Sequence, residues 1–179
     1  VVRLTVAGAA GRRRGWWLLV LPAALLALAF AVRAFLGVDH DVAVDVLSGF
    51  ALGTLLPLVA LIAGTGAIAP EIDDGSITYL LAKPVPRGRI VRSKLAVAAV
   101  VAVATGALAV LVAGLVMVGL DQGIAIAFGV GAALAAVAYA ALFLLLGVVS
   151  RHAVVIGLAY VLIWEGLIGG YVSGARTLS

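Results

Sequence analysis

The fold is decided by residues 124–149, which read IAIAFGVGAALAAVAYAALFLLLGVV. The stretch contains no charged residue and no proline. It is longer than the ~20 residues that an α-helix, rising about 1.5 Å per residue, needs to cross the ~30 Å apolar core of a bilayer. The apolar residues are continuous and do not alternate with polar ones, as they would in a membrane β-strand. We therefore predict that this stretch is a membrane-spanning helix.

Four further apolar runs lie on either side of this stretch. Together they predict five spans, over residues 16–36, 46–69, 95–120, 124–149 and 153–170. The tripeptide Asp121-Gln122-Gly123 is short enough to be a tight turn, so the third and fourth spans should form a helical hairpin. The predicted fold class is all-α, a polytopic transmembrane helical bundle of about five spans. A segment at 1–15 precedes the transmembrane domain, which we assign to 16–179.

The second run carries two features that concern its packing. Pro57 is expected to kink the helix because proline cannot donate a backbone hydrogen bond. Gly49 and Gly53 have the small-xxx-small spacing that permits close helix contact in membranes.

The composition excludes several classes of protein. The chain of 179 residues is 65% hydrophobic and 11% charged, whereas soluble domains are about half apolar and a quarter charged. Cysteine is absent, so disulfides and thiolate metal sites are excluded. His40 and His152 lie far apart, which argues against a histidine metal cluster. The net charge of +4 does not indicate nucleic acid here, because basic residues beside membrane spans set orientation.

The positions of lysine and arginine predict that orientation. If the N-terminus is cytoplasmic, only Arg33 and Arg176 of the twelve basic residues lie on the outer side. The opposite orientation would place the other ten outside, contrary to the positive-inside rule. We therefore expect 1–15 and the segment 70–94 to be cytoplasmic.

Segment 70–94 is the one long polar interruption, and its first part has the pattern of a short amphipathic helix at the membrane surface. Acidic residues stand near its beginning, where the helix dipole favours them, apolar residues follow at i, i+3 and i+4, and Pro84 prevents continuation. The residues that we assign to this surface are Glu71, Asp73, Asp74, Gly75, Ser76, Ile77, Leu80 and Leu81. A docking surface for a cytoplasmic partner needs such a helix, and a simple solvated linker does not.

A cluster of basic residues follows this helix. We expect its members to lie at the lipid phosphates, where each adds about 1 kcal/mol of attraction to an anionic leaflet. They are Arg87, Arg89, Arg92 and Lys94. An ordinary positive-inside cluster beside a solvated loop is the alternative reading of these four residues.

The same segment resembles the loop after the second span in permease subunits of ABC transporters of the type-2 export class. That family typically shows a Glu, then Gly-Thr, a leucine-rich turn, a Pro-x-x-Arg element and a Lys that opens the next span. The matching residues are Glu71, Gly75, Leu80, Leu81, Pro84, Arg87 and Lys94. Ser76 stands where Thr is commoner. The family usually has six spans, so the resemblance implies that the last one is missing from these five.

The resemblance implies that the segment is a coupling helix that docks on a separate ATPase subunit. No G-x-x-x-x-G-K-[ST] phosphate loop occurs in the chain, so we expect no ATPase activity of its own and no directly bound cofactor, with ATP used by the partner. The expected partners are a cytoplasmic ABC ATPase, a second permease copy or a related permease, and membrane lipids. The expected location is a bacterial plasma membrane, crossed several times.

Glu165 is the other notable residue. It lies about twelve positions into the fifth predicted span, roughly 18 Å along a helix, where a carboxylate must face other helices or water. A proton-coupled secondary transporter that uses Glu165 is therefore one alternative function, although such proteins usually have more spans and more intramembrane polar residues. A membrane scaffold that recruits a cytoplasmic partner without transport is the other.

Overall fold

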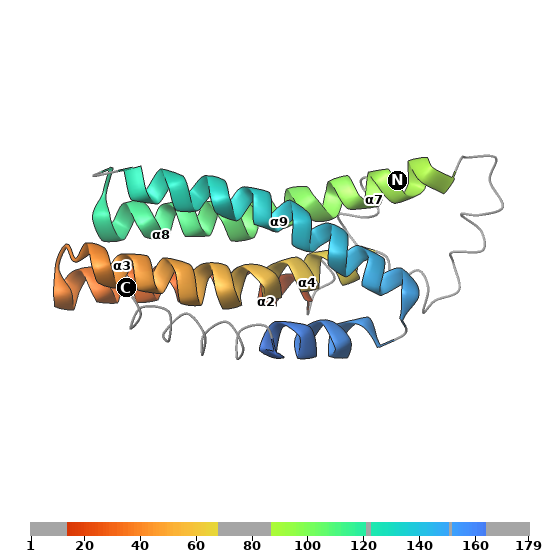
Figure 1. The fold of residues 1–179 in the computed structure, drawn as a ribbon, viewed down its shortest axis with the longest axis horizontal. Coiled ribbons are helices and arrows are strands. Elements are labelled where there is room, and N and C mark those ends of the chain that lie inside the picture. The colour runs from red at the N-terminus through yellow and green to blue at the C-terminus, as the bar shows by residue number, and fades with distance from the viewer. Residues whose placement is uncertain (1–13, 68–86, 121–122, 151, 164–179) are drawn as a thin grey trace, which may run out of the picture.

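The structure is a computed structural model, and it describes residues 14–67, 87–120, 123–150 and 152–163. These residues form helices (Figure 1). Four of the helical segments are long and apolar enough to cross a membrane: Leu18–Phe35, His40–Gly66, Gly88–Val118 and Ile124–Val149. The predicted all-α class is confirmed. A shorter apolar helix, Ala153–Ile163, lies within the predicted fifth span.

The first two long helices are joined by a tight turn. Helix α2 (Arg14–Leu36) is followed by Gly37, whose φ of 76° is a conformation that glycine adopts without strain. Asp39 then caps helix α3 (His40–Asp45), because its carboxylate accepts from the backbone N–H groups of Asp41 at 3.0 Å and Val42 at 3.2 Å.

Helix α3 continues into the π-helix η1 (Val46–Leu55) and helix α4 (Leu56–Gly66), so the second span is one unbroken helix. Pro57 lies in the first turn of α4, where its missing N–H group is tolerated. The preceding Leu56 N–H donates to the carbonyl of Ala51, five residues back. A π-helical segment thus lies directly on the N-terminal side of Pro57, and the expected kink stays a prediction.

The third span consists of α7 (Arg87–Ala102), a short π-helix η2 (Val103–Ala107) and α8 (Leu108–Val118). The last part of segment 70–94 is therefore helical from Arg87 onward. Gly119 and Gly123, with φ of 70° and 69°, lie in the turn to α9 (Ile124–Val149). Helix α9 covers the residues of the predicted fourth span, and the hairpin that it forms with α8 is as expected.

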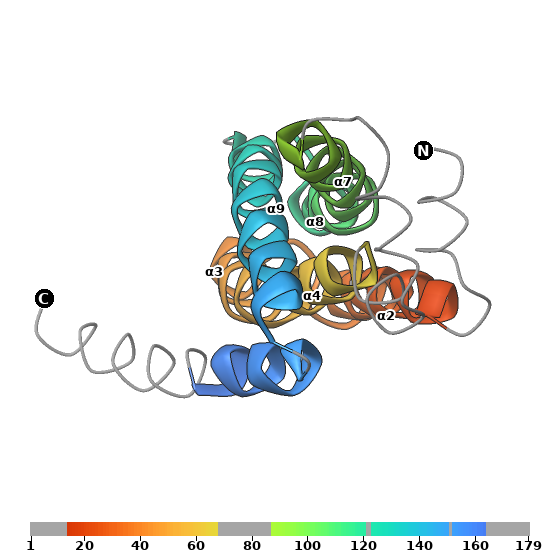
Figure 2. The same cartoon turned by 90° about the vertical axis from the view of Figure 1, so that its right-hand side faces the viewer.

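Successive long helices run antiparallel along the length of the molecule and pack into one bundle (Figures 1 and 2). The core is built largely from small residues, because alanine lets helix backbones approach closely. The larger side chains that are fully buried include Leu25, Leu55, Met117 and Phe143. Many other large apolar side chains face outward, such as Leu134, which is 71% exposed. Such an exterior suits lipid as the surrounding medium.

Helices α4 and α9 approach each other closely at Gly64. A Cβ atom at Gly64 would lie 2.9 Å from the Cβ of Phe143 and 3.0 Å from the backbone nitrogen of Leu144. Among the described residues of this single chain, no close helix contact occurs at Gly49 or Gly53. Gly49 is exposed, and a Cβ there would meet no described atom within 4 Å, while at Gly53 it would meet only a backbone atom of the same helix.

Candidate functional site

The predicted coupling residues lie outside the described part of the chain, in the interval 68–86. They are Glu71, Asp73, Asp74, Gly75, Ser76, Ile77, Leu80 and Leu81. Glu165 also lies outside the described residues. Their predicted roles stay predictions. The structure describes the residues on either side of this interval, Ala67 and Arg87, and these two points define the candidate site.

Both points lie at the same end of the bundle, which we call the loop end. Helix α4 ends there at Gly66, α7 begins there at Arg87, and α9 ends there at Val149 (Figure 1). The opposite end, which we call the turn end, holds the turn between α2 and α3 and the turn between α8 and α9. The interval 68–86 therefore connects to the second and third spans at the loop end.

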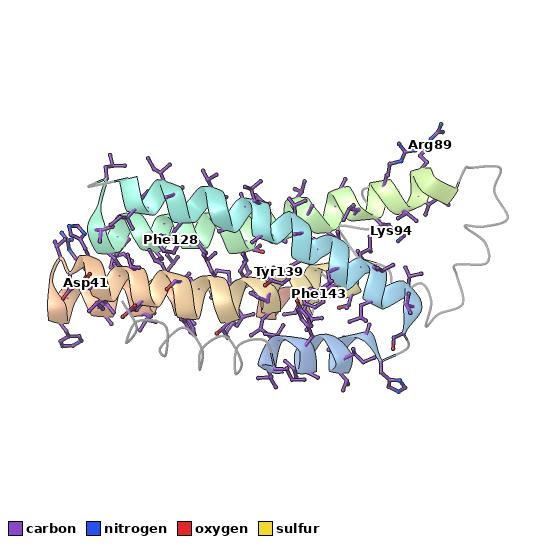
Figure 3. The ribbon with its side chains drawn as sticks, in the orientation of Figure 1. Asp41, Arg89, Lys94, Phe128, Tyr139 and Phe143 are labelled. Atoms are coloured by element: carbon purple, nitrogen blue, oxygen red, sulfur yellow. The ribbon has the colours of Figure 1, made fainter. Side chains whose placement is uncertain are left out.

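Two of the predicted basic residues are exposed at the loop end. Arg89 and Arg92 are both exposed on the first turns of α7, and Figure 3 shows Arg89 pointing away from the bundle. The Nε of Arg92 donates to the carbonyl of Gly88 in its own helix at 3.2 Å. The backbone of Arg87 begins the helix, and its side chain lies outside the description. The exposure of Arg89 and Arg92 leaves them free to meet lipid phosphates.

Lys94 differs from these arginines. We expected it at the lipid phosphates, but the structure buries its side chain inside the bundle. The side chain is 2% exposed, and its Nζ donates to the carbonyl of Ala67 at 2.8 Å. Ala67 caps the C-terminal end of α4, where the last carbonyls of a helix lack partners within the helix. A cation is favourable at that end of the helix dipole, so Lys94 turns inward.

A comparable bond closes the turn end of the bundle. Arg33, in the last turn of α2, donates from Nη1 to the carbonyl of Met117 in α8 at 2.9 Å. Around it, Asp39, Asp41 and Asp45 are all exposed. The described carboxylates thus gather at the turn end, and the described basic side chains other than Arg33 gather at the loop end.

Aromatic packing holds the helix Ala153–Ile163 against α9. The rings of Tyr139 and Phe143 are stacked with centroids 6.0 Å apart, and the ring of Tyr160 meets Phe143 edge-on at 6.4 Å. A Cβ at Gly157 would collide with Leu61 and approach Phe143. Both tyrosines therefore take part in packing around Phe143.

Sequence reasoning missed the bonds of Lys94 and Arg33 to helix ends. The partners are 27 and 84 residues apart in the chain, and no local sequence pattern predicts pairs at such separations. Among the described residues, no three His, Asp or Glu side chains are grouped as they would be around a metal ion.

A family model described as ABC-2 family transporter protein matches residues 10–175. The match covers most of the chain, so this chain belongs to the ABC-2 transporter family. It is a multi-pass membrane protein of a family of non-catalytic membrane subunits. Comparison with curated proteins and with solved structures gives no match, and the assignment rests on the family model.

Proposed function

We propose that this chain is the membrane-spanning permease subunit of an ATP-driven exporter and that it couples to a separate cytoplasmic ATPase through segment 70–94. The observation that carries the proposal is the position of the two residues that flank the interval 68–86. Ala67 and Arg87 lie at one end of a bundle of apolar helices, and the exposed basic residues Arg89 and Arg92 stand beside them. Family membership supports the same division of labour, because an ABC-2 subunit works with an ATPase partner.

The packing of the bundle offers a route from the loop into the membrane. Helix α4 packs against α9 at Gly64, where an added Cβ would lie 3.0 Å from the backbone nitrogen of Leu144. Its C-terminal end accepts a hydrogen bond from Lys94 of α7. Closely packed helices transmit displacement because interiors are nearly incompressible. A push on segment 70–94 would therefore move α4, α7 and α9 together at the loop end.

In the proposed cycle, ATP binding draws two partner ATPases together and displaces the segment. Two permease copies, or this chain and a related one, then rock between inward and outward access. The acidic start of the segment and the apolar face of Ile77, Leu80 and Leu81 dock on the ATPase, as amphipathic helices do in receptor grooves. Arg87, Arg89 and Arg92 hold the segment at the anionic lipid surface.

The test replaces the apolar face of the segment. Each leucine contact contributes about 1.5–3 kcal/mol when fully buried, so Leu80→Ser with Leu81→Ser should weaken binding of the ATPase by at least about tenfold. The measurement is co-purification of the cognate ATPase, with the amount of permease in the membrane determined in parallel. Arg89→Gln is the control, because it alters an exposed charge outside the docking face and should leave the ATPase bound.

Wild-type co-purification by the double leucine variant would show that this helix is not the docking element. If the wild-type chain itself retains no ATPase, the exporter proposal fails. Binding of a cytoplasmic protein without nucleotide-dependent movement of the bundle would favour the scaffold alternative.

A further inference from the structure

We propose that Lys94 is a positioning residue that couples the end of the second span to the third, so that a push on the segment moves both spans as one unit. This inference rests on the proposed function, because it concerns how the movement of the coupling segment reaches the membrane helices. It assigns to Lys94 a task different from that of the neighbouring arginines.

The geometry of Lys94 sets it apart within the basic cluster. It lies about two turns into α7, and its side chain passes inward to the carbonyl of Ala67, 2.8 Å from Nζ. Figure 3 shows Lys94 on the side of α7 that faces the bundle, whereas Arg89 projects from the other side. Ala67, like Lys94, is buried, at 3% exposed. The bond therefore joins two helices in a place that water does not reach.

The hydrogen bond between the Lys94 ammonium group and the Ala67 carbonyl is a strong one. Hydrogen bonds from charged donors are roughly twice as strong as neutral ones, and they strengthen further where the local dielectric is low. An apolar side chain cannot replace Lys94 without cost, because the buried carbonyl of Ala67 would lose this hydrogen-bond donor.

The position of the bond explains why it would matter for coupling. Ala67 is the last described residue before the interval 68–86, and α7 begins directly after that interval. Without the bond, a push on the segment could bend the end of α4 away from α7. With the bond in place, the two helix ends are displaced together, and Gly64 carries that displacement to α9.

The experiment measures movement of the third span relative to the first while the ATPase is bound. Because the chain has no cysteine, nitroxide labels can be attached at Leu19→Cys in α2 and Val100→Cys in α7, both exposed positions. Pulsed electron paramagnetic resonance then gives the distribution of label distances in the complex, before and after addition of MgATP with vanadate. The variants are Lys94→Met, which removes the donor, and Lys94→Arg, which keeps a cationic donor.

Ser93→Ala is the matched control. Ser93 is the neighbouring residue, and its Oγ donates at 2.8 Å to the carbonyl of Ile90 within α7, so the substitution removes a hydrogen bond but no link to α4. We expect the wild type and Ser93→Ala to show the nucleotide-dependent change in distance. Lys94→Met should keep the ATPase bound and lose at least half of that change, and Lys94→Arg should retain more of it than Lys94→Met.

A full wild-type change in Lys94→Met would overturn the inference, because a residue that only stabilises the fold would lower thermal stability and leave the movement intact. If Lys94→Met cannot be recovered as a complex, Lys94→Leu, which also removes the donor, takes its place under the same criterion. A wild-type complex that binds the ATPase and shows no nucleotide-dependent change would instead refute the proposed function.

Discussion

Gly64 shows how single residues decide the packing of this bundle. Its missing side chain lets α4 lie against the backbone of α9, where a Cβ would be 3.0 Å from Leu144 N and 3.1 Å from the carbonyl of Ala140. Backbone atoms within a helix cannot move aside cheaply. Gly49, which has the more recognisable spacing motif, lies on an exposed face and makes no such approach.

Gly64→Ala should therefore destabilise the protein, by about 1–3 kcal/mol, as overpacking does in well-packed cores. Gly49→Ala should be neutral or stabilising by up to about 1 kcal/mol, because alanine is the better helix former and nothing obstructs its methyl group. Unfolding titrated with a denaturing detergent measures both. Equal effects of the two substitutions would contradict the placement of α4 against α9.

The hairpin of α8 and α9 depends on backbone conformations at its turn. Gly119 caps α8 with φ 70° and ψ −145°, a region that is essentially restricted to glycine. Gly123 precedes α9 with φ 69° and ψ 10°, the left-handed region that asparagine also tolerates. A Cβ at either position would meet no atom of the described residues within 4 Å, so we expect the penalty of substitution to come from the backbone.

Gly119→Ala should accordingly cost about 1–3 kcal/mol of stability through strain, whereas Gly123→Asn should cost much less. Thermal unfolding of the two purified variants in the same detergent provides the comparison. If Gly119→Ala proves as stable as Gly123→Asn, the turn does not have this conformation.

At the scale of the whole molecule, the charges are distributed unequally between the two ends of the bundle. Exposed Arg89 and Arg92 mark the loop end, and exposed Asp39, Asp41 and Asp45 mark the turn end. From the positive-inside rule we expect the basic end to face the cytoplasm, which is also the side where an ATPase could reach segment 70–94.

Single cysteines in the otherwise cysteine-free chain test this orientation in intact cells. Asp41→Cys should react from outside with a membrane-impermeant maleimide, because Asp41 is exposed at the turn end. Ser76→Cys should react only after the cells are made permeable. The reverse pattern would overturn both the orientation and the docking of a cytoplasmic ATPase.

Much of the fold could be predicted from the sequence because lipid imposes simple conditions on a spanning segment. Backbone groups must be hydrogen-bonded within the segment, and the apolar run must match the bilayer thickness. These conditions are local, so the limits of α9 and its hairpin with the third span follow from residues 95–149 alone. The coupling role of Leu80 and Leu81 was inferred from pattern and resemblance, and it stays a prediction because those residues lie outside the described part of the chain.

Only the tertiary structure decided which residues connect one helix to another. Lys94 reads as one more cation in a basic cluster, yet it is buried because the open carbonyl end of α4 lies within reach of its Nζ. Among the described residues, Gly64 makes a close helix contact and Gly49 does not, because α9 crosses the second span beside Gly64. Such choices depend on which surfaces of distant segments meet, and hydrophobicity along a single helix does not contain that information.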